Sequence, residues 1–216
     1  MKSLIVSATE FEIAPFLSRF NLKRGINYMG TNQVFILITG VGMVATAFAM
    51  GQVLSSPSFD FAMNAGIAGS FNRSLKLGEI VQVMEDCFSE LGATDGASFI
   101  SIDQLGFGTG MAHPIPYQTL ESLTSTITQA KGITVNTIHG SEQEIAVIVQ
   151  QLQPDVESME GAAFFYSCNK LGIPCIQIRS VSNYVERRDT TQWDIPLAIH
   201  TLNEQLIQLY QTLYEA

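Results

Sequence analysis

The 216-residue sequence has little charge and no long apolar run. Only 14% of its residues are charged, and 20 acidic residues against 11 basic ones give a net charge of -9. Nucleic-acid binding needs clustered Lys and Arg, so we expect no nucleic-acid partner. No stretch approaches the roughly 18 apolar residues of a membrane span. The start, MKSLIVSATEFEIAPF, also lacks the longer apolar run of a signal peptide, so we expect no membrane segment.

Residues that form disulfides or bind metal ions are also few. The three cysteines are Cys87, Cys168 and Cys175. Their odd number and the lack of a C-x-x-C pair favour small core thiols in a reducing compartment, so we expect a cytoplasmic protein. The three histidines are His113, His139 and His200. They lack the spacing of metal ligands, so no metal site is expected.

The sequence does have enough apolar residues for a full core, at 46% of the chain, and no linker or repeat divides it. We therefore expect one domain over residues 1–216. Short apolar runs alternate with helical patterns, which indicates an α/β layered domain. The expected strands are Lys2–Ser7, Gln33–Thr39, Phe59–Asn64, Glu79–Glu85, Lys131–His139, Asp155–Met159 and Cys175–Val181. The expected helices are one that begins near Thr9 and those over Met43–Leu54, Glu142–Leu152, Gly161–Leu171 and Ile195–Tyr214.

Two segments depart from this alternation. The run NAGIAGSF, which begins at Asn64, is rich in glycine and predicts a turn after a strand. Residues Glu90–Tyr117 lack periodicity and contain five glycines and two prolines, which predicts a long irregular excursion. A loop of this length usually has a function or forms an interface.

Polar residues gather where strands are expected to end. They are Glu10 and Glu12, the TGVG turn, Glu157 to Glu160, and Ser182 with Asn183. In open α/β sheets, ligands bind in the crevice at the strand ends. The segment VESMEGAAFF places two of these carboxylates before a run that reads as buried, where a carboxylate must be paired, hydrogen-bonded or functional.

Four motifs follow one another along nearly the whole chain: ATEFE, NAGIAGSF, ESMEGAAFF and IRSVSN. Together they resemble the purine nucleoside phosphorylase and nucleosidase superfamily, and the segment SNYVERRDTTQW is most similar to its futalosine hydrolase branch. The resemblance implies a three-layer αβα fold with a central mixed, distorted sheet, no metal and no organic cofactor. It also implies a homodimer or larger homo-oligomer, in which part of Glu90–Tyr117 helps to close the neighbouring subunit's pocket. The implied activity is hydrolysis of the N-glycosidic bond of a purine nucleoside, futalosine, with release of hypoxanthine.

The resemblance assigns roles to three charged residues. Glu160 matches the carboxylate that accepts hydrogen bonds from the ribose hydroxyls, and Glu12 matches the general base that activates the attacking water. Arg179 matches a residue that helps to place this water. Glu10 and Glu157 are then interpreted as solvated neighbours. The residues alone also allow another interpretation of two of them. Glu160 is then a carboxylate stabilised by the N-terminus of a helix, and Arg179 forms a structural ion pair.

The matched substrate-binding residues are Val41, Ile67, Ala68, Met159, Glu160, Ser182 and Trp193. Asn183 stands where the adenine-specific nucleosidases have Asp. Its NH₂ group can donate to N7 or O6 of a 6-oxopurine but cannot transfer a proton, which favours hypoxanthine as the base released. Asn183 is also a common turn residue, and Trp193 either covers the ligand or anchors the last helix. Arg187 and Arg188 either meet the carboxylate of futalosine or face solvent.

Three other functions remain open. A phosphorylase would gather arginines around phosphate, but here Glu12 and the uncharged NAGIAGSF occupy the matching positions, so water is the expected nucleophile. A methylthioadenosine/S-adenosylhomocysteine nucleosidase would release adenine. A non-catalytic nucleoside-binding protein could use the same fold, because fold does not determine function.

Overall fold

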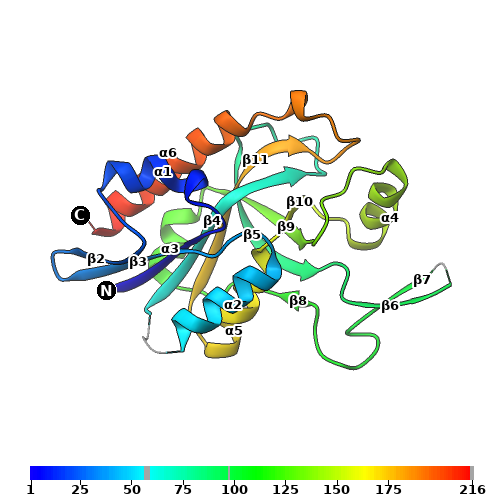
Figure 1. Cartoon of the computed structure of the whole chain (residues 1–216), viewed down its shortest axis with the longest axis horizontal. Helices are drawn as coiled ribbons and strands as arrows, with labels where there is room; N and C mark the ends of the chain where they lie inside the picture. Colours follow the sequence, from blue (N-terminus) through cyan, green and yellow to red (C-terminus); the bar gives the residue numbers. More distant parts are fainter. Residues whose placement is uncertain (56–58, 97, 215–216) are drawn as a thin grey trace.

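The first strand, β1 (Lys2–Ser7), forms where the sequence predicts it, and its side chains alternate between two hydrophobic cores. Leu4 and Val6 belong to one core and Ile5 to the other, as the two-residue period of a strand requires. The computed structural model describes residues 1–55, 59–96 and 98–214. Figure 1 shows the sheet between two sets of helices, so the central layer separates the two cores.

The main sheet is mixed and runs in the order β10-β9-β5-β11-β4-β1-β3-β2. Its strands are β1, β2 (Gly25–Met29), β3 (Asn32–Ile38), β4 (Phe61–Ser70), β5 (Ile80–Phe88), β8 (Met111–Ala112), β9 (Thr128–Thr134), β10 (Val156–Ser158) and β11 (Cys175–Tyr184). The short strand β10 pairs with β9 in parallel and also with the end of β4 in antiparallel orientation. Because of this second pairing, β4, β11, β5, β9 and β10 close into a ring, which is the distortion expected of the sheet.

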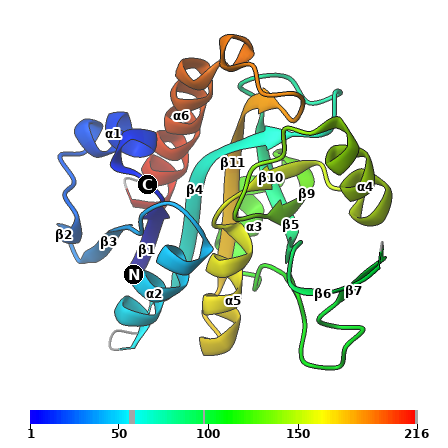
Figure 2. The same cartoon turned by 45° about the vertical axis from the view of Figure 1, so that its right-hand side comes forward.

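Helices cover both faces of the sheet. They are α1 (Glu10–Arg19), α2 (Met43–Leu54), α3 (Gln118–Thr124), α4 (Glu142–Leu152), α5 (Gly161–Leu171), the 3₁₀ turn η1 (Thr190–Gln192) and α6 (Ile195–Tyr214). Helices α1 and α6 pack together on one face, and α2 and α5 pack together on the other (Figure 2). The predicted three-layer αβα fold is therefore confirmed.

Most of the predicted elements are confirmed. Helices α2, α4, α5 and α6 have the predicted bounds, and the three cysteines are buried free thiols. The prediction that NAGIAGSF is a turn is wrong, because these residues continue β4 as far as Ser70. Gly66 and Gly69 are not turn residues: a Cβ at either position would crowd the side chains that neighbouring elements place against the strand. Strand β2, helix α3 and the turn η1 were not predicted from the sequence.

The excursion Glu90–Tyr117 is more regular than predicted. It contains a hairpin of β6 (Gly92–Asp95) and β7 (Ser98–Ser101), and β8 pairs with β5 at its far end. Figures 1 and 2 show this hairpin away from the main sheet. Residue 97, inside the excursion, lies outside the described residues.

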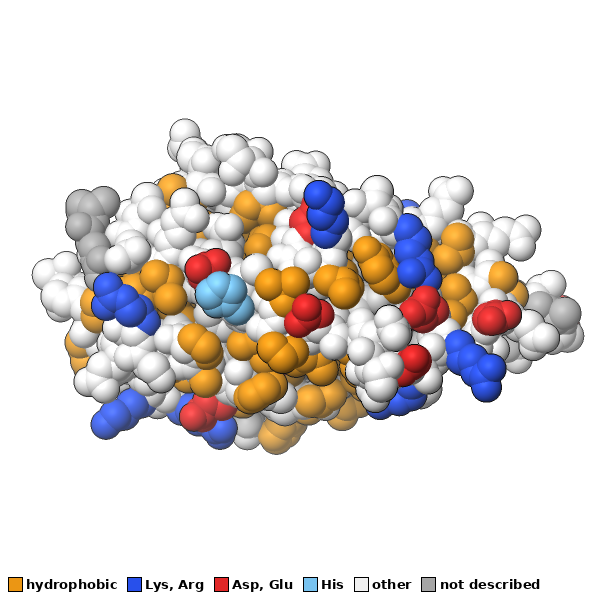
Figure 3. All heavy atoms as spheres, turned by 90° about the horizontal axis from the view of Figure 1, so that it is seen from above, with side chains coloured by type: hydrophobic (Ala, Val, Ile, Leu, Met, Phe, Trp, Pro, Cys, Tyr) orange, Lys and Arg blue, Asp and Glu red, His pale blue; other side chains and the backbone are white. Residues whose placement is uncertain are grey.

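The surface shows no large field of one charge on the face drawn in Figure 3, where Lys and Arg side chains are dispersed among Asp and Glu. Hydrophobic side chains lie between them. Among the helices formed by the described residues, none combines the length and the apolarity needed to cross a membrane.

Candidate active site

A cavity of about 540 Å³ opens where β1, β4, β10 and β11 end. Nine of the ten predicted site residues line it, namely Glu12, Val41, Ile67, Ala68, Met159, Glu160, Ser182, Asn183 and Trp193. The tenth, Arg179, lies behind the wall and is only 1% exposed. The structure thus brings together residues from six segments of the chain.

Glu12 enters the cavity from the first turn of α1, where the sequence TEFE forms a capping box. The Glu12 backbone N–H donates to the Thr9 hydroxyl, and the Glu12 carboxylate accepts from the Thr9 N–H at 3.0 Å. The Thr9 and Ser7 hydroxyls donate to the same carboxylate oxygen, Oε2. The other oxygen, Oε1, accepts the backbone N–H of Ile67 at 3.1 Å. Glu12 is thus buried with a fixed orientation, whereas Glu10 is exposed and paired with Arg24, as predicted for a solvated neighbour.

Gly66 lets Arg179 approach Glu12. A Cβ at Gly66 would overlap Nη1 of Arg179 and would lie 3.0 Å from Oε1 of Glu12. The guanidinium and the carboxylate therefore meet the backbone of β4 at the same residue. This placement explains the first glycine of NAGIAGSF, which leaves room for the Arg179 and Glu12 side chains.

A buried chain of hydrogen bonds holds Arg179 from behind. Its Nε donates to Gln177 at 2.9 Å, and its Nη2 donates to Asn64. Gln177 in turn donates to Asp86 at 3.0 Å, and the Thr134 hydroxyl donates to the other Asp86 oxygen at 2.8 Å. Burial raises the pKa of Asp86 to about 6, although the hydrogen bonds from Gln177 and Thr134 favour its charged form. Arg179 has no direct carboxylate partner among the salt bridges of the described residues, so the structural ion pair considered for it is not formed.

Glu160 is the N-cap residue of α5, yet its side chain makes no capping bond to its own helix. Its Oε1 instead accepts the backbone N–H of Gly42 at 2.9 Å. Gly42 has a φ of +99°, which an L side chain rarely adopts, and so the TGVG turn can aim this N–H at the carboxylate. Burial raises the pKa of Glu160, opposed by the positive charge of Arg179 and by the Gly42 hydrogen bond. Glu160 therefore lies at a helix N-terminus, as one alternative proposed, but its carboxylate is directed across the cavity.

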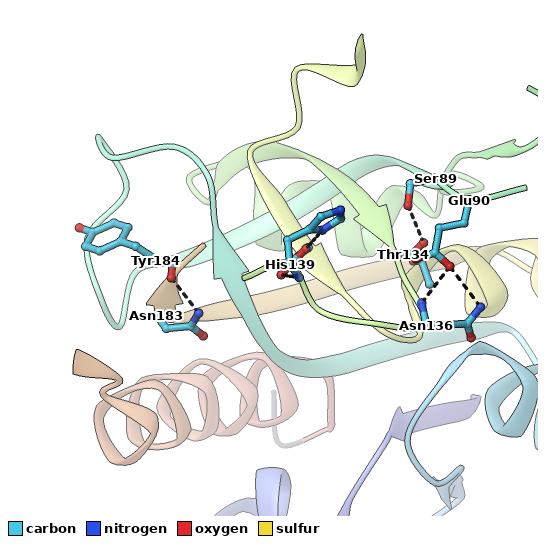
Figure 4. A network of polar contacts seen from close by, with 8 residues as sticks. Ser89, Glu90, Thr134, Asn136, His139, Asn183 and Tyr184 are labelled. Atoms are coloured by element: carbon cyan, nitrogen blue, oxygen red, sulfur yellow. Dashed lines mark hydrogen bonds and ion pairs between the residues drawn. The ribbon is translucent and has the colours of Figure 1, made fainter. Parts of the chain in front are cut away.

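The interpretation of Glu157 as a solvated residue is wrong. Glu157 is 4% exposed, and its two oxygens accept the His139 backbone N–H at 3.1 Å and contact the His139 ring Nδ1 at 2.6 Å. Strand β10 is buried along its whole length because β9 pairs with one edge and β4 with the other. The hydrogen bond that Glu157 accepts from the His139 ring raises the pKa of His139. The close-up in Figure 4 shows His139 in the same region as Asn183 and Tyr184.

Asn183 reaches the cavity through an irregularity in β11. The register of β11 against β4 shifts between Val181 and Asn183, so that Asn183 lies opposite Gly69. The Ser182 hydroxyl donates to the Asn183 Oδ1 at 2.8 Å. The Asn183 Nδ2 donates to the Tyr184 carbonyl at 3.1 Å, as Figure 4 shows. These two hydrogen bonds fix the orientation of the Asn183 amide, with Oδ1 toward Ser182 and Nδ2 toward the Tyr184 carbonyl. The second N–H of Nδ2 is thereby directed away from the Tyr184 carbonyl.

The rim of the cavity carries an aromatic residue and a cation. Trp193 is half-buried at the wall, and the guanidinium of Arg188 lies 4.8 Å from the centre of its ring. The adjacent Arg187 lines a separate groove with Arg73. Of the two arginines, only Arg188 is thus placed beside the cavity.

Sequence reasoning missed His139, Phe11 and Tyr184, which also line the cavity. His139 could have been found, because it stands at the predicted end of a strand and the same criterion selected Asn183. Phe11 and Tyr184 are adjacent to selected residues and carried no separate signal. Within the described residues, no group of three or more His, Cys, Asp or Glu side chains could hold a metal ion.

The chain is similar to a known family and to several known proteins. The family model of the phosphorylase superfamily matches residues 4–213. The futalosine hydrolase of Thermus thermophilus is 29% identical over 210 residues, which cover 92% of this chain and 91% of that protein. The 5'-methylthioadenosine/S-adenosylhomocysteine nucleosidase of Colwellia psychrerythraea is 25% identical over 235 residues, covering 97% and 94%. A solved structure of futalosine hydrolase from Helicobacter pylori has a TM-score of 0.80 over 98% of both chains at 15% identity, which shows a shared fold.

Proposed function

Because the chain belongs to the phosphorylase superfamily, we propose that it is a nucleosidase that hydrolyses the N-glycosidic bond of futalosine and releases hypoxanthine and dehypoxanthine futalosine. This reaction would serve menaquinone biosynthesis, and residues 1–216 would act as one catalytic domain. The observation that carries the proposal is the convergence of Glu12, Glu160 and Asn183 on one cavity. Three tasks follow from the chemistry: the site must activate water, hold the ribose and stabilise the departing base.

Glu12 is suited to the first task. Donors from Thr9, Ser7 and Ile67 fix its carboxylate in the cavity wall, so that it needs no reorganisation to accept a proton. Arg179 meets β4 at the same glycine and would orient the water beside Glu12. The water oxygen then bonds to C1′ as the C1′–N9 bond breaks. The proton passes to Glu12, and the bonding electrons leave with the base.

Glu160 is suited to hold the sugar. A carboxylate that accepts two ribose hydroxyls forms charge-assisted hydrogen bonds, each worth about 1.5–3 kcal/mol. The Gly42 N–H occupies part of Oε1 and leaves the remaining lone pairs for a ligand. The negative charge of Glu160 would also stabilise positive charge that develops on the ribose. Met159, the residue before it, lines the cavity and would pack against the sugar.

Asn183 is suited to the base. Its Nδ2 carries a second N–H beyond the one that bonds the Tyr184 carbonyl. Donated to N7 or O6 of a 6-oxopurine, this N–H would stabilise the negative charge of the departing base. Because an amide cannot transfer a proton, a water molecule would protonate hypoxanthine after the C1′–N9 bond has broken.

Water is favoured over phosphate as the nucleophile. A phosphate dianion needs several well-directed cationic donors. As the proposed base, Glu12 would lie beside the nucleophile, and its negative charge would repel phosphate. The enzyme is therefore proposed to be a hydrolase.

A second candidate is a methylthioadenosine/S-adenosylhomocysteine nucleosidase, which the similarity to the Colwellia psychrerythraea enzyme favours. Asn183 speaks against it, because an amide cannot supply the proton that an acid could give to adenine N7. Base release from futalosine, inosine and methylthioadenosine in parallel, followed by chromatography, separates the candidates. Hypoxanthine from futalosine alone is the expected result. Adenine from methylthioadenosine would favour the second candidate, and no release from any would favour a non-catalytic nucleoside-binding protein.

The proposed enzyme is a cytoplasmic homodimer or larger homo-oligomer. Exposed apolar side chains support an assembly: Val44 and Phe48 on α2 are 77% and 67% exposed, and Phe107 in the excursion is 80% exposed. None of the described residues of Glu90–Tyr117 lines the cavity of its own chain, so this segment is available to a neighbouring subunit. Light scattering after gel filtration tests this proposal, and a monomer at micromolar concentration would contradict it.

A further inference from the structure

Behind the cavity, Asp86 and Gln177 form a buried polar pair that the proposed mechanism does not use. Both are buried, and neither lines the cavity. The Gln177 Nε2 donates to Asp86 at 3.0 Å, and the Gln177 Oε1 accepts the Nε–H of Arg179 at 2.9 Å. Burying an ionised carboxylate is costly unless it is hydrogen-bonded and balanced by a nearby charge. The contact with Arg179 gives this carboxylate such a charge at the distance of one amide.

The order of donors and acceptors fixes the orientation of Gln177. An arginine side chain has only donors, and an ionised carboxylate has only acceptors. The amide between them must therefore present its oxygen to Arg179 and its NH₂ group to Asp86. The second oxygen of Asp86 accepts the Thr134 hydroxyl at 2.8 Å, and the same hydroxyl oxygen accepts the Ala162 backbone N–H at 2.7 Å. The negative charge of Asp86 thus orients a chain of hydrogen bonds that ends on the guanidinium.

The three nitrogens of this guanidinium have different neighbours. Nε donates to Gln177 and Nη2 donates to Asn64, whereas Nη1 lies at Gly66, the residue that Glu12 also approaches. Because two hydrogen bonds hold two different nitrogens of a planar group, they fix both its position and its plane. The third nitrogen is thereby directed to the side of β4 on which the proposed base lies.

Asp86 balances the charge of Arg179 from the opposite side. Burial raises the pKa of Asp86, and the positive charge of Arg179 is among the influences that oppose this rise. The two charges therefore interact although Gln177 separates them. The pair has little room to move, because a Cβ at Gly161, at the start of α5, would overlap both the carboxylate and the amide.

We propose that Asp86 and Gln177 are positioning residues for Arg179: Asp86 supplies the counter-charge, and Gln177 transmits it, so that the guanidinium is fixed beside the attacking water. This inference rests on the proposed function. It adds to that function the two residues that hold the water-orienting group.

An exchange of the two side-chain types tests the pair. Asp86→Asn combined with Gln177→Glu keeps the size of both side chains and the total charge. In this double variant the carboxylate at position 177 still accepts the Arg179 Nε–H, the amide at position 86 donates to that carboxylate, and the amide oxygen still accepts from Thr134. Each single substitution breaks the order: Asp86→Asn removes the charge, and Gln177→Glu sets two carboxylates against each other.

Steady-state kinetics with futalosine separate an effect on the water from an effect on substrate binding. The assay is run at about pH 8, where Asp86, with a pKa of about 6, is ionised. Asp86→Asn should lower kcat by about 10-fold or more, because a small displacement of Arg179 misplaces the water. KM should stay within about twofold, since Arg179 lies behind the wall and the substrate does not contact the pair. The double variant should recover kcat to within about threefold of the wild type.

Ser180→Ala is the matched control. Ser180 is buried next to Arg179 on β11, and the substitution removes its hydrogen bond to Thr201 of α6. It should keep kcat within about twofold of the wild type, because consecutive residues of a strand face opposite sides of the sheet. A loss as large as that of Asp86→Asn would overturn the proposal, because any buried hydrogen bond near Arg179 would then have the same effect.

Thermal melts of the same proteins give a readout that does not depend on catalysis. Gln177→Glu should lower the melting temperature, and adding Asp86→Asn should raise it again. A Gln177→Glu protein that does not fold, beside a double variant that does, would support the pair equally. Full kcat in Asp86→Asn, or a folded double variant with no better kcat than Asp86→Asn, would overturn the proposal, even if its melting temperature recovers. Failure of an active wild type to follow this pattern removes only this inference, whereas a wild type that releases no base removes the proposed function and the positioning role with it.

Discussion

The backbone N–H of Ile67 lies 3.1 Å from Oε1 of Glu12, and so the candidate base at the start of α1 is fixed to the middle of β4. Replacing Glu12 by Gln removes the proton acceptor but keeps the size of the side chain and one oxygen, which can accept either from Ile67 or from Thr9. We expect kcat to fall by about 10²–10⁴-fold in a protein that still folds, with a lower melting temperature because the donors on one side lose their acceptor. Steady-state rates and a thermal melt measure the two effects.

Glu10→Gln is the matched control for this variant, because Glu10 lies on the same turn but is exposed and pairs only with Arg24 at the surface. Its activity should stay within about twofold of the wild type, since exposed ion pairs contribute little. Near-normal turnover by Glu12→Gln would remove Glu12 from its assigned role.

The pH dependence of kcat/KM reports on Glu160. Only the ionised carboxylate can accept both ribose hydroxyls, and burial raises its pKa above the ordinary 4.5. Activity should therefore be lost as the pH falls through a value higher than that of an ordinary glutamate. A profile that stays flat down to pH 4.5 would show that the ionised form of Glu160 is not required.

The substitution Gly66→Ala tests the site without removing any polar group from it. The methyl group of Gly66→Ala would overlap the Arg179 guanidinium, which is buried and cannot move away easily. We expect about a 100-fold loss of kcat/KM, because a displacement of about 1 Å in an active site can have an effect of this size. Gly51→Ala is the control, because open space surrounds that position on α2. It should retain activity and gain about 0.5–1 kcal/mol of stability. Equal activities of the two variants would contradict this account.

Asp86 makes a defined contribution to stability. Its pKa of about 6 in the folded protein lies above its ordinary value of 3.8. A raised pKa means that the folded state binds the proton more tightly, so this contribution is complete below pH 3.8 and is lost as the pH rises through about 6. Urea unfolding of the wild type and Asp86→Asn across this range should give a free-energy difference that changes by about 3 kcal/mol. Parallel curves for the two proteins would refute the assignment.

The sequence predicted the fold where local signals agree with the tertiary structure. Helix α5 has the predicted bounds because Gly172, with a φ of +66°, ends it as the sequence pattern indicates. The prediction of a turn from glycine was wrong in β4. There the glycines are needed because side chains from other elements pack closely against the strand. A turn and a crowded strand both require glycine, and only the neighbours distinguish them.

The site was predictable in part for the same reason. Glu12 and Glu160 follow strand ends and belong to recognisable motifs. The pairing of Glu157 on β10 with His139, in the connection between β9 and α4, joins residues 18 positions apart, and the chain from Arg179 to Asp86 spans a still longer separation. No local pattern encodes these contacts, because they depend on the pairing of strands that are far apart in the sequence, β11 with β5 and β10 with β9.

The most direct test of the central claim is the phosphate dependence of hypoxanthine release from futalosine. With Glu12 at the nucleophile position, the rate should be the same with and without phosphate, and the sugar product should carry no phosphate. A rate that requires phosphate, with a sugar phosphate as the product, would contradict hydrolysis by a water activated at Glu12.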